Sequence, residues 1–169
     1  MANYTFSRTG AEIEAILNHA DRKFKKLHTE TADGTASFIQ FLTDDDGNPF
    51  DVEELVMYAT IPATDYAVRF TLYLQDASGE WKPTNASTTS PMQRSDRTQY
   101  TETRWYNRCD RWQCESVTSG STTIGSYTYR SVGDTSSDAG SITRIRSARM
   151  AITGSVSLPA GTIFEFWGR

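Results

Sequence analysis

The stretch that decides the fold is residues 66–75, which read YAVRFTLYLQ. Apolar or aromatic side chains occupy every second position of it. The alternating set is Tyr66, Val68, Phe70, Leu72 and Leu74. A repeat of two places alternate side chains on opposite faces of an extended chain. The stretch therefore predicts a strand of an antiparallel sheet with one buried face.

Similar runs recur along the chain, separated by turn residues such as those at 44–49, 76–79 and 159–161. The strands that we predict are 37–43, 52–61, 66–75, one beginning at 80, 100–108, 111–118, 122–132, 142–152, 154–158 and 162–167. Residues 84–98 and 133–140 are predicted to be polar loops. Many short strands without an internal repeat favour an antiparallel β-sandwich or jelly roll over a propeller or solenoid.

Composition limits the classes of function. Only 37% of the 169 residues are hydrophobic, but the chain has eight Tyr, eight Phe and four Trp, which suits a mainly β protein with a thin core. The net charge of −4 offers no general case for nucleic-acid binding. The first residues lack the features of a secretory signal, and no apolar run is long enough for a membrane-spanning helix. We therefore expect neither nucleic acid nor a membrane as a partner.

The N-terminal part shows a helical pattern. Thr9 is a good N-cap and Glu12 completes a capping box, so we predict a helix over residues 10–27. Its apolar stripe consists of Ile13, Ile16, Leu17, Ala20, Phe24 and Leu27. The spacing resembles heptads, which favours self-association as a stalk, although packing against the chain's own β-domain remains an alternative. The predicted organisation is an anchor and helix at 1–34 and a β-sandwich head at 35–169.

Signals for chemistry are few. Catalytic Ser-His-Asp geometry needs a histidine in the folded head, and His19 and His28 are expected on or just after the helix. A calcium loop of the EF-hand type beginning at Asp44 fails at its last ligand position, which is Leu55. Cys109 and Cys114 have too few histidine partners for zinc. We expect both thiols to be reduced, and a disulfide between them that forms after lysis of the cell is the alternative. We predict no catalytic residue, metal or cofactor.

A hydrolytic reading remains as a minor hypothesis. A glycosidase needs two carboxyl groups at a set separation. The acidic residues that could supply them are Asp51, Glu53, Glu54, Glu80, Glu102 and Glu115. Acidic residues in surface strands are far more often solvated than catalytic, so we predict that the protein is not an enzyme.

Residues 99–129 are the richest in recognition chemistry. Aromatic side chains and arginines interleave there, a composition that contact surfaces favour. The candidate recognition residues are Tyr100, Arg104, Trp105, Tyr106, Arg111, Trp112, Tyr127 and Tyr129. Cross-strand pairing within the sheet is an equal alternative. A monomeric carbohydrate-binding module would use Trp105, Tyr106 and Trp112 as a stacking platform.

Two short segments, residues 9–17 and 154–162, carry a resemblance to known proteins. Residues 9–17, TGAEIEAIL, resemble the N-terminal segment of phage fibre and head-fibre proteins, where a similar opening leads into a short helix. Residues 154–162, GSVSLPAGT, are similar to the penultimate hairpin of trimeric jelly-roll heads on such fibres. The resemblance covers little of the chain between them.

The resemblance implies a structural protein of the virion. It implies a homotrimer anchored by its N-terminal segment to other virion proteins of the capsid, portal or tail. The β-head would face outward, with a host surface glycan as a further candidate partner. Because the chain is short for a receptor-binding tail fibre, the expectation narrows to a capsid decoration protein, a head fibre or a short tail-associated spike.

Overall fold

The structure of the protein is a computed structural model that describes residues 24–63, 70–87, 98–108, 111–121, 126–135, 139, 141–152 and 157–169. All the regular secondary structure in these ranges is β-strand. The strands are β1 (Lys25–Thr31), β2 (Phe38–Phe41), β3 (Glu54–Ile61), β4 (Phe70–Gln75), β5 (Trp81–Ser87), β6 (Gln99–Arg108), β7 (Arg111–Ser121), β8 (Ser126–Thr135), β9 (Ala148–Ile152) and β10 (Ile163–Gly168). The prediction of a mainly β protein is confirmed.

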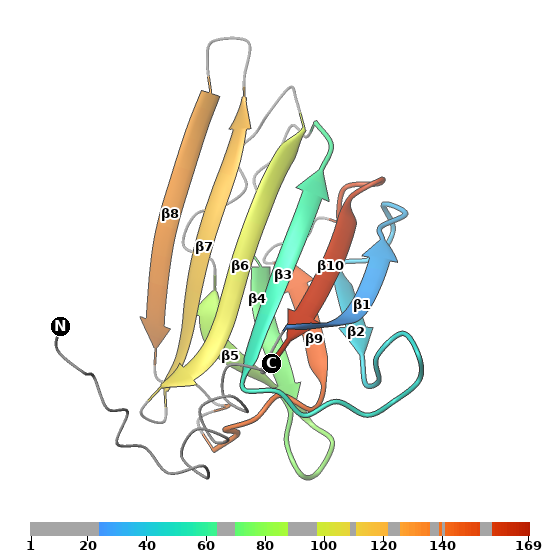
Figure 1. Cartoon of the computed structure of the whole chain (residues 1–169), viewed down its shortest axis with the longest axis vertical. Helices are drawn as coiled ribbons and strands as arrows, with labels where there is room; N and C mark the ends of the chain where they lie inside the picture. Colours follow the sequence, from blue (N-terminus) through green and yellow to red (C-terminus); the bar gives the residue numbers. More distant parts are fainter. Residues whose placement is uncertain are drawn as a thin grey trace, which may run out of the picture.

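The strands form two antiparallel sheets, one in front of the other in Figure 1. The six-stranded sheet has the order β1-β10-β3-β6-β7-β8, and the four-stranded sheet has the order β2-β9-β4-β5. The chain crosses repeatedly between the two sheets, so that strands far apart in sequence become neighbours. The predicted antiparallel sandwich is therefore confirmed at the level of two packed sheets.

Strand β4 shows how the deciding stretch acts in the fold. Phe70, Leu72 and Leu74 are at most 1% exposed, whereas Tyr73 between them is partly exposed. The alternation in sequence thus becomes one face in the core and one face outside, as expected for a half-buried strand.

The turn after β4 is held by Asp76. Its Oδ1 accepts hydrogen bonds from the backbone N–H groups of Ser78 (2.9 Å) and Glu80 (3.0 Å). Gly79 completes the turn with a φ of 84°, a conformation that glycine adopts without strain. This local chemistry explains why a turn was predictable here.

The hydrophobic core lies between the sheets. Phe70 from the smaller sheet meets Phe164 from the larger one edge to face, with ring centres 5.9 Å apart. The largest fully buried side chains are Trp105, Trp112, Phe70, Phe164 and Phe166. The indole Nε1 of Trp112 donates hydrogen bonds to the carbonyl oxygens of Ala139 (3.2 Å) and Ile142 (3.0 Å), so this polar atom is satisfied inside the core.

The main correction concerns the end of the predicted helix. The prediction is wrong for residues 25–27, because residues 25–31 form β1 and pair with β10. Leu27 is 1% exposed and belongs to the core of the sandwich, so it is not available to a stalk. The physical reason is that the backbone of this segment pairs along its length with β10, and its threonines favour extended backbone. Strand pairing with β10 prevails over local helical spacing.

The boundary between anchor and head moves accordingly. The sandwich begins no later than Lys25, not at residue 35. Phe24 lies just before β1, with the guanidinium carbon of Arg169 4.8 Å from its ring centre. The stripe residues Ile13, Ile16, Leu17 and Ala20, and the rest of the predicted helix, lie outside the described residues.

Several strand limits also differ from prediction. In the segment 142–152 the strand begins only at Ala148, and the predicted loop 84–98 still belongs to β5 as far as Ser87. Strand β8 continues to Thr135. Residues 157 and 158 of the predicted strand 154–158 are not in a strand, and the rest of that stretch lies outside the described residues.

Candidate interaction surface

Strand β6 divides the candidate recognition residues between two environments. Tyr100, Arg104 and Tyr106 are partly or well exposed on the outer face of the six-stranded sheet. Trp105 lies between the last two and is fully buried. Because side chains alternate along a strand, residues of similar chemistry one position apart end up in the core and on the surface.

The predicted platform of tryptophans is therefore wrong. Trp105 and Trp112 are both 0% exposed and belong to the core, so neither can stack on a ligand in the folded chain. Arg111 is exposed at the start of β7. Tyr127 and Tyr129 are in β8, opposite Gly120 and Thr118; their side chains lie outside what the structure describes.

A charged cluster occupies one end of the outer face. Glu54 of β3 is only 8% exposed. Its Oε2 accepts a hydrogen bond from Nε of Arg169 (2.7 Å), and its Oε1 lies 3.6 Å from a terminal nitrogen of Arg104. Arg104 also donates from Nε to Glu102 (2.8 Å). Two arginines thus neutralise a nearly buried carboxylate, as burial of such a group requires.

Tyr106 and Glu115 complete this cluster. The Tyr106 hydroxyl donates to Oε1 of Glu115 at 2.6 Å. This hydrogen bond, together with desolvation, raises the pKa of Tyr106 to about 12, so the phenol remains a donor near neutral pH. With Glu54, Arg104 and Arg169, these side chains line a hollow of about 440 Å³.

An apolar strip lies next to the charged cluster on the same face. Ile163 of β10 is 44% exposed, Tyr58 of β3 is 41% exposed and Tyr100 of β6 is 59% exposed. Thr60 pairs with both Ile163 and Tyr100 across the sheet. A second hollow, of about 420 Å³, is lined in part by Tyr58, Tyr100 and Val117. Three neighbouring strands thus present large apolar groups to the outside.

Tyr58 and Ile163 were not among the recognition residues predicted from the sequence. Residues 55–57 of β3 are Leu55, Val56 and Met57, all at most 1% exposed, so the period of two that would separate an inner from an outer face is hidden. The sequence does show a tyrosine and an isoleucine within predicted strands. Which of the two alternating sets of side chains in a strand points outward becomes clear only once the register with β6 is known.

The carboxylates named for a hydrolase are all engaged. Glu54, Glu102 and Glu115 contact Arg169, Arg104 and Tyr106 as described above, and Glu80 pairs with Lys82 at 2.7 Å. Asp51 and Glu53 bind Arg144 at one end of the sandwich. Each of these carboxylates sits beside a cation or a hydrogen-bond donor.

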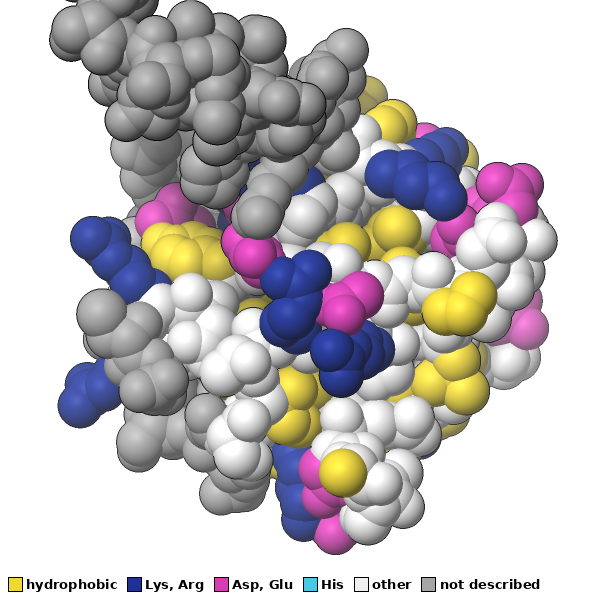
Figure 2. All heavy atoms as spheres, turned by 60° about the horizontal axis from the view of Figure 1, so that its bottom comes forward, with side chains coloured by type: hydrophobic (Ala, Val, Ile, Leu, Met, Phe, Trp, Pro, Cys, Tyr) yellow, Lys and Arg dark blue, Asp and Glu magenta, His cyan; other side chains and the backbone are white. Residues whose placement is uncertain are grey.

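That end of the sandwich carries a mixed charge network, which Figure 2 turns toward the viewer. The guanidinium of Arg144 donates to Asp51 and to Glu53 (2.7 Å), and Arg146 donates to Asp51 at 2.9 Å. Arg144 first, and then Arg146, hold the pKa of Asp51 below its usual value. The network joins the segment before β3 to the segment before β9, which is a structural role.

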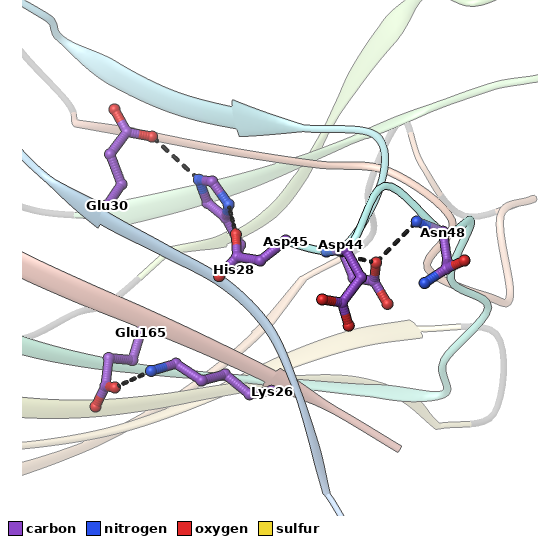
Figure 3. Close-up of polar contacts among 8 residues, drawn as sticks. Lys26, His28, Glu30, Asp44, Asp45, Asn48 and Glu165 are labelled. Atoms are coloured by element: carbon purple, nitrogen blue, oxygen red, sulfur yellow. Dashed lines mark hydrogen bonds and ion pairs between the residues drawn. The ribbon is translucent and has the colours of Figure 1, made fainter.

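Figure 3 shows a second polar cluster, around β1 and the turn at 44–48. Oδ1 of Asp44 accepts from the backbone N–H groups of Asp46 (3.1 Å) and Asn48 (2.8 Å), and Oδ2 binds Nζ of Lys25 at 2.5 Å. These hydrogen bonds lower the pKa of Asp44. The acidic turn is therefore fixed by its own backbone and by β1.

His28 lies beside this turn. Its Nδ1 is 2.7 Å from Asp45 and its Nε2 is 3.2 Å from Glu30, and the ring stacks on Phe41 with centres 4.8 Å apart. Within the described ranges, no group of three or more His, Cys, Asp or Glu residues is placed to hold a metal ion. Cys114 is a free, buried thiol.

Comparison of the chain with protein-family models, curated proteins and solved structures finds no match. In the part of the chain that the structure describes, no helix is long and apolar enough to cross a membrane. The function must therefore be argued from the surfaces of the sandwich.

Proposed function

We propose that the protein is a non-enzymatic structural protein of a virus particle that assembles with copies of itself through the outer face of the six-stranded sheet. The observation that carries the proposal is the exposed apolar strip of Tyr58, Tyr100 and Ile163 on three adjacent strands. Clustered exposed apolar groups on a soluble domain mark interaction sites.

The surroundings of the strip fit an interface between proteins. Ion pairs border it, with Arg104 bound to Glu102 and Lys26 bound to Glu165 at 2.5 Å. An apolar centre with a polar rim is the usual anatomy of such contacts. Six strands about 4.8 Å apart and about eight residues long make a face of roughly 750 Å², close to the area of about 800 Å² that one partner contributes to a standard interface.

The strand order supports a jelly-roll head. With the hairpin of β7 and β8 set aside, eight strands remain. The first pairs with the last, the second with the seventh, the third with the sixth and the fourth with the fifth. Jelly rolls occur in viral capsid proteins and in lectins, so the fold is compatible with a virion protein by analogy alone.

The virion assignment rests on the resemblance of residues 9–17 to phage fibre proteins. It leads us to propose a homotrimer that docks to capsid, portal or tail proteins through its N-terminal segment, as a decoration protein, head fibre or short spike. The first four residues of the heptad-like stripe, Ile13, Ile16, Leu17 and Ala20, support a stalk, and the apolar strip supports contacts between heads. The two contacts can act together within one closed symmetric assembly.

Light scattering of the full chain tests self-assembly. We expect a mass of three chains. The double variant Tyr58→Glu and Tyr100→Glu places charges on the strip and should reduce the mass to one chain, because a buried unpaired charge is strongly unfavourable. The control is Leu42→Glu, which places one such charge at a residue that is 48% exposed and follows β2 of the other sheet, and it should leave the mass unchanged.

A second pair of substitutions separates the head from the stalk. Ile13→Lys with Leu17→Lys interrupts the apolar stripe without touching the sheet. If only this pair dissociates the assembly, the stalk is the interface and the role of the sheet face is wrong. A native chain that stays monomeric at high concentration would contradict self-assembly through either surface.

The competing function is a monomeric carbohydrate-binding module. Its predicted platform of Trp105, Tyr106 and Trp112 is not formed, because both tryptophans are in the core. The proposal of a structural protein does not depend on glycan binding, and the mass measurement above distinguishes it from a module that acts as a single chain.

A further inference from the structure

The outer face of the four-stranded sheet carries a different chemistry from the strip. At its centre is Arg149 of β9, which pairs with Gln40 of β2 on one side and with Tyr73 of β4 on the other. Phe38 of β2 is 44% exposed, and Trp81 of β5 is partly exposed. These five residues are called the Arg149 platform.

The guanidinium of Arg149 is held in a fixed position. Its Nε and Nη2 both donate to the amide oxygen of Gln40, at 2.9 and 2.6 Å. The guanidinium carbon lies 4.9 Å from the ring centre of Phe38 and 4.5 Å from that of Trp81. Phe38 and Trp81 come from strands on opposite sides of β9, so aromatic surface flanks the cation. Such cation–π contacts orient an arginine without neutralising it.

Arg149 differs from several other arginines of the chain in the groups that it contacts. Arg104, Arg144 and Arg169 each contact a carboxylate. Among the described residues, no carboxylate lies within ion-pairing distance of Arg149, whose only described hydrogen-bond acceptor is a neutral amide. An arginine side chain is always charged, and its Nη1 has no acceptor among the described residues. The platform thus offers a positioned positive charge beside flat apolar rings.

We propose that the Arg149 platform binds acidic sugar residues of a surface polysaccharide. A sugar carboxylate would accept hydrogen bonds from the free edge of Arg149, a charge-assisted contact that is strong and directional. The apolar C–H face of the same sugar ring would contact the part of Trp81 or Phe38 that the guanidinium of Arg149 leaves uncovered. A sugar ring has one apolar face and a polar rim, which matches a flat aromatic surface with a few fixed polar groups.

An acidic peptide is the competing occupant, and the geometry favours the sugar. A peptide carboxylate sits at the end of a flexible side chain and needs no flat partner, whereas Phe38 and Trp81 flank the cation itself. The proposal goes beyond self-assembly, because it uses the sheet opposite to the apolar strip. The two surfaces can therefore fail independently.

Calorimetric titration of the full chain with trigalacturonate tests the proposal. The first comparison ligand is the fully methyl-esterified trisaccharide, which has the same rings without the charge. We expect trigalacturonate to bind and the ester to bind at least about tenfold more weakly. Arg149→Gln, which keeps a planar polar group but removes the charge, should weaken trigalacturonate binding by a similar factor, and Trp81→Ala should also weaken it.

Arg146→Ala is the matched control. It removes one positive charge from a side chain that is 71% exposed and pairs with Asp51 at the end of the sandwich, and binding should be unchanged. Arg149→Lys provides a second variant that keeps the charge and should retain part of the affinity. Unfolding curves of each variant confirm that the fold is intact.

Three kinds of result would overturn the proposal. One is the absence of trigalacturonate binding up to about 10 mM. Another is equal binding of the ester, or equal loss in Arg146→Ala and Arg149→Gln. The third is tighter binding of a triglutamate peptide that does not depend on Trp81, which would assign the platform to acidic peptides. None of these results changes the expected mass of the assembly, so failure here is distinct from failure of the proposed function.

Discussion

The inner and outer faces of the six-stranded sheet are built from neighbouring residues with opposite roles. Trp105 is in the core and Tyr106 is outside, bound to Glu115. On β10, Phe164 is fully buried while Ile163 is 44% exposed. The comparison teaches that residue type alone does not determine which aromatic side chains lie in the core and which lie on the surface. The position of a residue in the strand alternation determines it, once the strand register is fixed.

The sharpest test of this division uses the two neighbours on β10. Phe164→Ala should lower the free energy of unfolding by about 3–5 kcal/mol, because it leaves a cavity between the sheets. Ile163→Ala should lower it by only about 0.5 kcal/mol in the isolated chain, while weakening self-association. Urea unfolding at low protein concentration measures the first effect, and light scattering measures the second. Equal losses of stability in the two variants would contradict the assignment of faces.

Cys114 and Tyr106 have similarly raised pKa values for different reasons, one on each face. Burial raises the pKa of the Cys114 thiol to about 12, whereas an unfolded thiol ionises near 8.5. As the pH rises above about 8.5, the unfolded chain loses this proton first, so the folded state is destabilised. The loss should reach about 2 kcal/mol at pH 10.

Unfolding of the native chain and of Cys114→Ala at pH 7 and pH 10 checks this expectation. The variant should lose less stability than the native chain over this interval, by about that amount. In the folded native chain the thiol should also react slowly with an alkylating reagent at pH 8. Equal alkaline losses in both chains would show that the thiol is not held in the core.

The smallest expected difference in stability between paired variants concerns the charged cluster on the outer face. Glu54→Gln removes the charge that faces Arg104 and Arg169 on a nearly buried side chain, and should cost about 1.5 kcal/mol. Glu80→Gln affects a side chain that is 65% exposed and pairs with Lys82, and should cost close to nothing. Thermal unfolding of both variants measures the difference. A larger loss in Glu80→Gln would reverse the expected ranking.

Local signals made most of the sheet predictable. The alternation at 66–75 and the turn residues near Asp76 act within a few positions, so they can be recognised without knowing the fold. The end of the predicted helix failed because Leu27 fits the spacing of the apolar stripe, and only its pairing with β10 places it in a strand. The prediction of a tryptophan platform was wrong for a related reason, since both faces of β6 carry aromatic side chains.

The two surfaces required the three-dimensional arrangement. Tyr58, Tyr100 and Ile163 come from three strands that are separate in the sequence but share one face. In the Arg149 platform, Arg149 lies more than 60 positions along the chain from each of the other four residues. Such surfaces are set by pairing register, which short patterns do not encode.

The pairing of β1 with β10 also constrains how the chain reaches its native state. Lys26 and Glu165 meet across these strands although they are separated by 139 positions in the sequence. During synthesis β1 is made early and must wait for β10, and contacts of this separation slow folding because a long loop must close first. Until then neither edge of β1 is paired, and the charges of Lys25 and Lys26 protect it from pairing with other nascent chains.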